Sequence, residues 1–145
     1  MLYLTRRERF NAAHRMFRPD WDDQENMAVY GKCSNPNWHG HNYTLFVTVK
    51  GNINPETGLV INLKTLSALI RERIIEKIDH KNINVEVEFM KGLIASSENL
   101  VVAIWNELEQ AVRDQGALLY RIRLEESENN FIEYYGTNAG FVFQQ

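Results

Sequence analysis

Apolar and polar residues alternate in four segments of the chain. Alternation of this kind predicts strands, because side chains in extended backbone point to opposite faces in turn. Two of the segments, residues 2–14 and 39–50, lie near the N-terminus, and two, residues 118–126 and 131–135, lie near the C-terminus. The asparagine-rich connection at residues 128–130 predicts a tight turn. We therefore expect antiparallel pairing within each pair of strands.

Between these pairs, apolar residues recur at helical spacing in two segments. The first helix is expected to begin at Asn62, a plausible N-cap, and to end near residues 79–80. The second is expected to begin at Ser96 or Ser97, with Glu98 in its first turn, where the helix dipole favours an anion.

Two stretches show neither the alternation of a strand nor the apolar spacing of a helix. Residues 18–38 are rich in Pro, Asp, Asn and Gly and predict a long loop, and residues 81–95 predict irregular backbone. Loops as long as residues 18–38 are uncommon in compact domains unless they have a function.

The order strand, strand, helix, helix, strand, strand predicts an α+β fold. A four-stranded antiparallel sheet would carry two helices on one face. The other face would need cover, for which a partner chain is a natural source. The length of 145 residues and the lack of a linker or repeat predict one domain over residues 1–145.

Charge and cysteine content narrow the classes of function. The chain has 16 basic and 19 acidic residues, and this net charge of −3 disfavours a nucleic-acid partner held by bulk electrostatics. No apolar run reaches the ~20 residues of a membrane span, and no signal peptide is expected. The single cysteine excludes an internal disulfide. We expect a soluble, reducing, cytoplasmic setting.

Three of the four histidines suggest a metal site. His39 and His41 are two residues apart on one strand face, and His14 lies on the apolar face of the first strand. Pairing of these strands would bring His14 to the other two. Strand histidines commonly serve packing, but three imidazoles without a fourth protein ligand are typical of catalytic zinc with one open position.

Other candidates lie near turns and helix ends. Cys33 is either an inert packed thiol or, in a loop near a cation, a reactive one. Asp79 and His80 either cap a helix or form a pair that moves protons. Glu126 continues the apolar face of its strand whereas Glu125 faces away, so Glu126 is the better carboxylate for a 2-amino-4-oxo heterocycle.

Taken together, these residues resemble a known family. Residues 31–43, with the sequence Gly-Lys-Cys-Ser-Asn-Pro-Asn-Trp-His-Gly-His-Asn-Tyr, resemble the signature of the 6-pyruvoyl tetrahydropterin synthases. Four further stretches match in the same order, so the resemblance covers essentially the whole chain: Ala13-His14-Arg15, Ile78-Asp79-His80-Lys81-Asn82, Ser96-Ser97-Glu98-Asn99 and Glu126-Ser127-Glu128-Asn129-Asn130.

The resemblance implies a T-fold whose subunits join their sheets into a trimeric barrel, two trimers forming a hexamer with active sites between subunits. It also implies roles for individual residues. Zinc would be bound by His14, His39 and His41. Proton transfer would fall to Cys33, Asp79 and His80. The pterin would be anchored by Glu126 in a pocket lined by Ser97 and Glu98.

The implied substrate is 7,8-dihydroneopterin triphosphate, which loses triphosphate and undergoes internal redox to give 6-pyruvoyl tetrahydropterin. The same machinery gives 6-carboxytetrahydropterin in queuosine biosynthesis. The five residues between Cys33 and His39 favour the pyruvoyl type, whose spacing they resemble. Two further hypotheses compete with these activities: a non-catalytic zinc- or pterin-binding member of the family, and an unrelated metal-bound interaction protein.

Two positions depart from the family pattern. Trp38 stands where the family has glycine, so a positive φ there would strain it. Glu125 stands where the family has an apolar residue or tyrosine. The triphosphate has candidate partners in Lys32, Lys64 and Arg15, which the sequence does not place.

Overall fold

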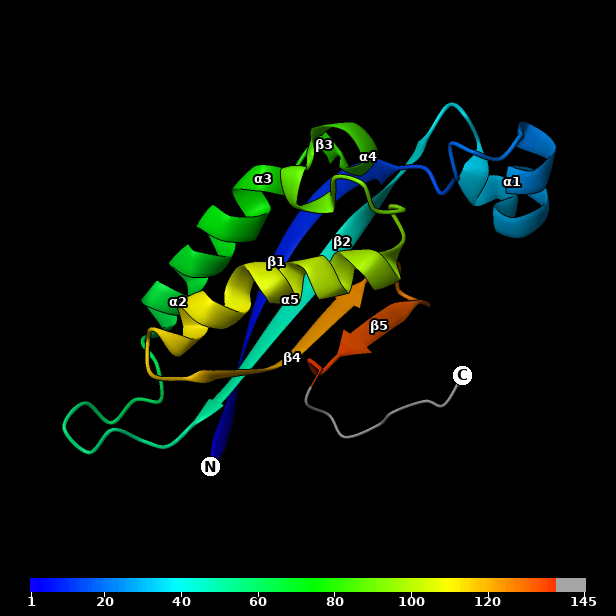
Figure 1. Cartoon of the computed structure of the whole chain (residues 1–145). Coiled ribbons are helices and arrows are strands. Elements are labelled where there is room, and N and C mark those ends of the chain that lie inside the picture. Colours follow the sequence, from blue (N-terminus) through cyan, green and yellow to red (C-terminus); the bar gives the residue numbers. More distant parts are fainter. Residues whose placement is uncertain (138–145) are drawn as a thin grey trace.

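Five strands form one mixed sheet in the computed structural model, which describes residues 1–137 (Figure 1). Their order is β3-β1-β2-β4-β5. The bounds are β1 Leu2–His14, β2 His39–Gly51, β3 Lys81–Asn82, β4 Leu118–Glu125 and β5 Phe131–Tyr134. The predicted four antiparallel strands are present as β1, β2, β4 and β5. The prediction was incomplete, because the short β3 adds a parallel pairing to β1 at Ala12 and Ala13.

Two long helical segments cover one face of this sheet (Figure 1). The first comprises α2 Leu63–Ile70, a π-helical turn at Arg71–Ile75 and α3 Glu76–Ile78, and the second is α5 Ser97–Arg113. Asn62 caps α2 by accepting the N–H of Lys64 at 2.9 Å. Of the two serines expected as the N-cap of the second helix, Ser96 is the one that caps it, because its Oγ accepts the N–H of Asn99 at 3.2 Å.

The core lies between the helices and the sheet. Its largest fully buried side chains are Tyr43, Leu45, Leu66, Ile70, Ile74, Ile78, Ile83, Leu100, Ile104, Leu108, Ile122 and Leu124. The opposite sheet face carries no helix among residues 1–137 (Figure 1). Within that range no helix has both the length and the apolar character needed to cross a bilayer.

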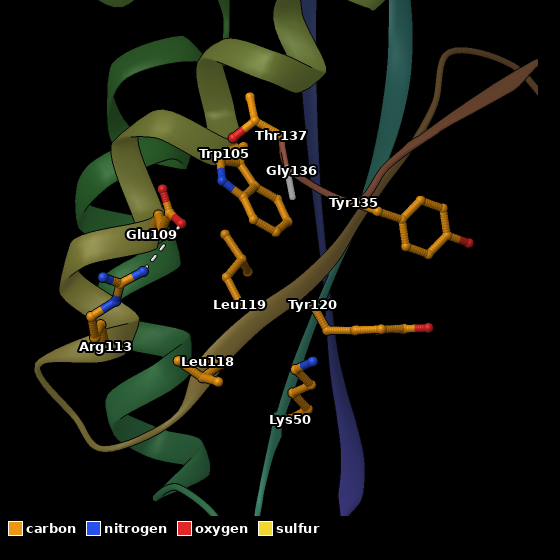
Figure 2. A pocket seen from close by; sticks show the side chains of 10 residues that line it. All are labelled: Lys50, Trp105, Glu109, Arg113, Leu118, Leu119, Tyr120, Tyr135, Gly136 and Thr137. Atoms are coloured by element: carbon orange, nitrogen blue, oxygen red, sulfur yellow. Dashed lines mark hydrogen bonds and ion pairs between the residues drawn. The ribbon is translucent and has the colours of Figure 1, made fainter. Parts of the chain in front are cut away.

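An irregularity in β4 changes which of its residues are buried. Thr48 pairs with Arg121 but Val49 pairs with Leu119, so Tyr120 is an extra residue in the ladder. The bulge turns Leu119 into the core and leaves Leu118 46% exposed, contrary to the alternation expected from the sequence. Figure 2 shows the result in a hollow between α5 and β4, where Leu119 points toward Trp105 and Tyr120 points away.

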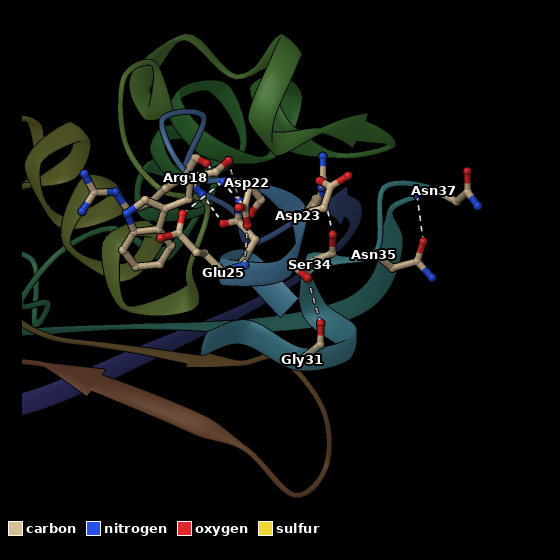
Figure 3. Close-up of polar contacts among 11 residues, drawn as sticks. Arg18, Asp22, Asp23, Glu25, Gly31, Ser34, Asn35 and Asn37 are labelled. Carbon is tan, nitrogen blue, oxygen red and sulfur yellow. Dashed lines mark hydrogen bonds and ion pairs between the residues drawn. The ribbon is translucent and has the colours of Figure 1, made fainter. Parts of the chain in front are cut away.

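Residues 18–38 were expected to form a loop, and this was wrong. They contain α1, Asp23–Tyr30, and a 3-10 turn, Gly31–Ser34. Asp22 accepts the N–H of Glu25 at 2.8 Å, and the Glu25 carboxylate accepts the N–H of Asp22 (Figure 3). The helix α1 has no apolar stripe, and this capping box stabilises its first turn instead. The Asp-x-x-Glu spacing was the signal in the sequence that could have predicted the helix.

The stretch 81–95 is mostly irregular, as expected, but it also contains short regular elements. After β3 come α4, Ile83–Glu86, and a 3-10 turn, Glu88–Met90. These elements connect α3 to α5 and bring the carbonyl of Ala95 against the end of β1.

Candidate functional site

Three imidazoles converge where β1 ends and β2 begins. The antiparallel register places His14 opposite His39 and places Ala12 opposite His41, so all three rings share the helix-covered face. The ring centroid of His14 lies 4.5 Å from that of His39 and 5.0 Å from that of His41. One nitrogen from each ring lies within 4.8 Å of the others, which is close enough for the three to share one metal ion.

The hydrogen bonds of the triad leave nitrogens free for a ligand. His14 is buried, and its Nδ1 donates to the carbonyl of Ala95 at 2.7 Å. That bond fixes the tautomer and leaves Nε2 as a lone-pair donor. Nε2 of His14 and both ring nitrogens of His39 are buried without a hydrogen-bond partner among residues 1–137. Buried unpaired nitrogens are costly, and a metal ion would satisfy them.

The surroundings keep these rings neutral. Burial lowers the pKa of His14, His39 and His41 below the ordinary value, and it is the largest cause for each. Repulsion from a neighbouring imidazole lowers each pKa further, while the Glu126 carboxylate opposes the shift. Neutral imidazole is the form that coordinates a metal, so the site is prepared to bind one at neutral pH.

Acid is therefore expected to destabilise the metal-free protein. The folded-state pKa values lie below the unfolded value of 6.5, so the unfolded chain binds more protons as the pH falls. The contribution to stability is full above pH 6.5 and is lost as the pH falls from there toward the folded-state pKa values. Urea unfolding of chelator-treated protein between about pH 7.5 and about pH 5.5 measures this. His39→Asn should make the dependence shallower, and an unchanged slope would contradict the expectation.

A carboxylate and a hydroxyl adjoin the triad. Oε1 of Glu126 lies 3.1 Å from Nε2 of His41, and its other oxygen accepts a hydrogen bond from the Ser97 hydroxyl. Ser97, Glu98 and Glu126 line one hollow, together with Met16, Leu124, Asn129, Asn130, Phe131 and Ile132. The three residues predicted to hold the heterocycle thus lie together beside the histidines.

The two neighbouring glutamates face opposite sides of the sheet. Glu125 pairs with Arg123 at 2.8 Å on the face without helices, while Glu126 faces the triad. Glu126 keeps the orientation expected from alternation because the bulge at Tyr120 lies before Ile122, and the strand is regular from there on. Burial and the charge of Glu126 raise the pKa of the nearby Tyr43 phenol far above its ordinary value, so that phenol stays protonated.

Cys33 lies in the 3-10 turn that follows α1 and is partly buried. Its carbonyl accepts the N–H of Met16 at 2.8 Å, which ties the turn to the chain just past His14. Arg15 supports the same turn by donating from Nε to the carbonyl of Ser34 at 2.7 Å. Trp38, in the link to His39, has φ +66°, so the strain expected of a residue other than glycine at this position is present.

Asp79 and His80 form a pair at the end of α3. Oδ2 of Asp79 lies 2.9 Å from Nδ1 of His80. Oδ1 accepts the N–H of Asn11 at 3.0 Å, and the N–H of His80 donates to the carbonyl of Asn11 at 2.7 Å. The hydrogen bond from the N–H of Asn11 lowers the pKa of the Asp79 carboxyl most, and His80 lowers it further. The pair is therefore anchored to β1 with an ionised carboxylate, and sequence spacing gave no sign of the Asn11 anchor.

This pair lies near the triad but is not part of the cluster of three ligand nitrogens. His80 lines one hollow with Asn11, Gly40, Asn42 and His41 of the triad, and it lines a second with Asp79, Arg9 and Asn42. The structure thus assembles His14, His39, His41, Ser97 and Glu126 in one cluster, and it holds Asp79 and His80 against the backbone of Asn11, outside the group of three ligand nitrogens.

Comparisons with known proteins agree with this geometry. The family model described as 6-pyruvoyl tetrahydropterin synthase matches residues 3–137. A 6-pyruvoyl tetrahydrobiopterin synthase of Pongo abelii is 41% identical over 133 residues, covering 92% of this chain and 90% of that protein. A 6-carboxy-5,6,7,8-tetrahydropterin synthase of Rickettsia typhi is 26% identical over 149 residues, covering 92% of this chain and 99% of that protein.

Structural comparison gives the same result. The Caenorhabditis elegans 6-pyruvoyl tetrahydropterin synthase superposes with a TM-score of 0.87 at 32% identity, covering 94% of this chain and 96% of that one. With the family model matching nearly the whole of residues 1–137, the chain belongs to the 6-pyruvoyl tetrahydropterin synthase family.

Proposed function

We propose that this chain is a zinc-dependent lyase that converts 7,8-dihydroneopterin triphosphate into 6-pyruvoyl tetrahydropterin with loss of triphosphate. The observation that carries the proposal is the triad of neutral imidazoles with unpaired nitrogens, placed beside the Glu126 carboxylate in one hollow. The metal site lies beside a carboxylate that can accept hydrogen bonds from a heterocycle. This arrangement fits a pterin whose ring binds the carboxylate and whose side chain reaches the metal.

Glu126 orients the substrate. Its carboxylate accepts hydrogen bonds from the ring N–H and the 2-amino group of the pterin, a paired geometry that few other side chains provide. Ser97 holds that carboxylate by donating to its second oxygen. Glu98, exposed at the first turn of α5, closes the rim of the same hollow.

His14, His39 and His41 would hold the zinc ion. Bound there, zinc supplies Lewis acidity that draws electron density from a side-chain oxygen and acidifies the neighbouring C–H bonds. The carbonyl of Ala95 accepts a hydrogen bond from the His14 ring. Hydrogen bonds of this kind to a metal-binding histidine fix both its tautomer and its orientation.

Cys33 and the Asp79–His80 pair move the protons. Cys33 would remove a C–H proton as its thiolate, and Asp79 would orient His80 as it returns protons to the product. The pair would come from a neighbouring subunit, because within one protomer Asp79 and His80 lie outside the cluster of three ligand nitrogens. Closure of the sheets into a trimeric barrel, stacked as a hexamer, would cover the face that carries no helix.

The 6-carboxy product is the second candidate, because the Rickettsia typhi relative is named for it. The higher identity to a 6-pyruvoyl enzyme, 41% against 26%, favours the first. Mass spectrometry of the product formed from 7,8-dihydroneopterin triphosphate separates the two, since the carboxy product has lost two side-chain carbons. We expect 6-pyruvoyl tetrahydropterin; only the carboxy product would overturn that assignment, and no turnover would overturn the enzymatic proposal.

A further inference from the structure

The side chain of Asn84 continues the pairing between β1 and β3 beyond the point where the two backbones separate. The backbones pair at Ala12 and Ala13 of β1, after which the second segment turns into α4. Oδ1 of Asn84 accepts the N–H of Arg15 at 3.0 Å, and its Nδ2 donates to the carbonyl of Arg15 at 2.8 Å. Arg15 and Asn84 are 69 positions apart, the same offset as in the strand pairs, so the side-chain amide takes the place of a further backbone partner.

One side chain therefore holds both backbone groups of Arg15. The ladder with β2 ends at the pair of His14 with His39, and beyond it the amide of Asn84 is the partner of the Arg15 N–H and of its carbonyl. An amide suits this position because it donates and accepts at once, whereas a carboxylate only accepts. A residue of α4 thus fixes the backbone where it leaves the metal triad.

Arg15 and its neighbour in turn hold the 3-10 turn that carries the Cys33 thiol. Nε of Arg15 donates to the carbonyl of Ser34 at 2.7 Å. The N–H of Met16 donates to the carbonyl of Cys33 at 2.8 Å. Because these two residues directly follow His14, the place of the thiol relative to the triad depends on how firmly the backbone at Arg15 is held.

We propose that Asn84 is a positioning residue that sets the Cys33 thiol against the metal triad. The inference rests on the proposed function and deepens it by naming what holds the proton-transferring turn in place. Asn84 acts through the backbone of Arg15 and lies outside the cluster of three ligand nitrogens. A displacement of about 1 Å at a reacting group can cost about a hundred-fold in rate, so the clamp affects the chemical step. Binding of the pterin should be spared, because Glu126 lies on a different element.

Asn84→Ala removes both bonds to Arg15 and keeps the cap of α4, because the N–H that Asn82 accepts there belongs to the backbone. We expect kcat to fall about 10- to 100-fold, with KM for 7,8-dihydroneopterin triphosphate changed less than about two-fold. Zinc content should stay the same. Asn84→Asp keeps an acceptor for the Arg15 N–H and loses the donor to its carbonyl, so its kcat should lie between those of Asn84→Ala and the wild type. If Asn84→Ala does not fold, Asn84→Asp is compared with the wild type in the same way.

The matched control is Asn62→Ala, which also removes an asparagine side chain that bonds to backbone. Asn62 caps α2 by accepting the N–H of Lys64 at 2.9 Å, and it has no contact with the turn of Cys33 through hydrogen bonds. Its loss should lower the urea midpoint and leave kcat and KM unchanged. Equal losses of kcat in Asn62→Ala and Asn84→Ala would show a general effect of stability and would overturn the positioning role.

Alkylation of Cys33 by iodoacetamide gives a readout that needs no turnover, because the chain has a single cysteine. The thiol is partly buried, so loosening its turn should raise the labelling rate about five-fold in Asn84→Ala and leave it constant in Asn62→Ala. Labelling of Asn84→Ala at the wild-type rate would overturn the inference. Wild-type kcat in Asn84→Ala would also overturn it and would leave the proposed function standing. Faster labelling confined to the Asn84 variants, without turnover by any of the proteins, would support the clamp and contradict the proposed function.

Discussion

Replacing His39 by alanine is expected to abolish metal binding and to lower kcat by on the order of a thousand-fold or more, because the metal site loses one of only three protein ligands. His39 is the cleanest position for this test. Its ring nitrogens make no hydrogen bond within residues 1–137, so the substitution removes a ligand and little else. Metal content measured by plasma mass spectrometry should fall from about one zinc per chain to none.

The matched control is His80→Asn. His80 has φ +60°, and asparagine tolerates that backbone conformation better than alanine does. This variant should keep its zinc while losing turnover, since His80 belongs to the proton-transferring pair and not to the triad. Full metal content in His39→Ala would show that the triad is not the metal site.

Cys33→Ala is expected to lower kcat by about 100- to 10,000-fold, the usual contribution of a proton-transferring group. Zinc content and the urea midpoint should stay the same, because Cys33 contributes its carbonyl, not its thiol, to the hydrogen bond with Met16. Assay, metal analysis and unfolding of one preparation test the three parts together. Wild-type turnover in the variant would exclude the thiol from the reaction.

Mixing two inactive variants tests the division of the site between subunits. Cys33→Ala keeps an intact Asp79–His80 pair, and Asp79→Asn keeps an intact thiol. Co-refolded at equal amounts, they should recover about a quarter of wild-type turnover, because random assembly places an intact thiol against an intact pair in that share of sites. No recovery would mean that both groups act within one protomer and would contradict a site shared between subunits.

The sequence predicted the elements whose side-chain period is clear. The alternation that ends in His14 and the alternation that begins at His39 predicted both strands, and the register then brought the three imidazoles together. The helices over residues 63–78 and 97–113 followed from their apolar stripes and their caps. Each of these patterns is local and repeats several times along its segment, and the structure contains the element that each one predicts.

What the sequence missed depends on single residues or on distant contacts. The helix α1 has no apolar stripe and rests on the capping box of Asp22 and Glu25. The extra residue at Tyr120 exchanges the buried and exposed positions at Leu118 and Leu119 without changing the composition of β4. The bond from Asn11 to Asp79 spans 68 positions, and no periodicity encodes it.

The outer side of β1 has a consequence for the newly made chain. The short β3 reaches only Ala12 and Ala13, so from Leu2 to Phe10 no strand lies beside that edge within residues 1–137. Open edges recruit other extended polypeptides and so promote aggregation. Arg6 pairs with Glu8, but Arg7 and Arg9 have no ion-pair partner among residues 1–137, so two such edges brought together would oppose like charges. Electrostatic repulsion thus protects a nascent chain from mispairing with its own kind, while a strand bearing acidic side chains would still be admitted.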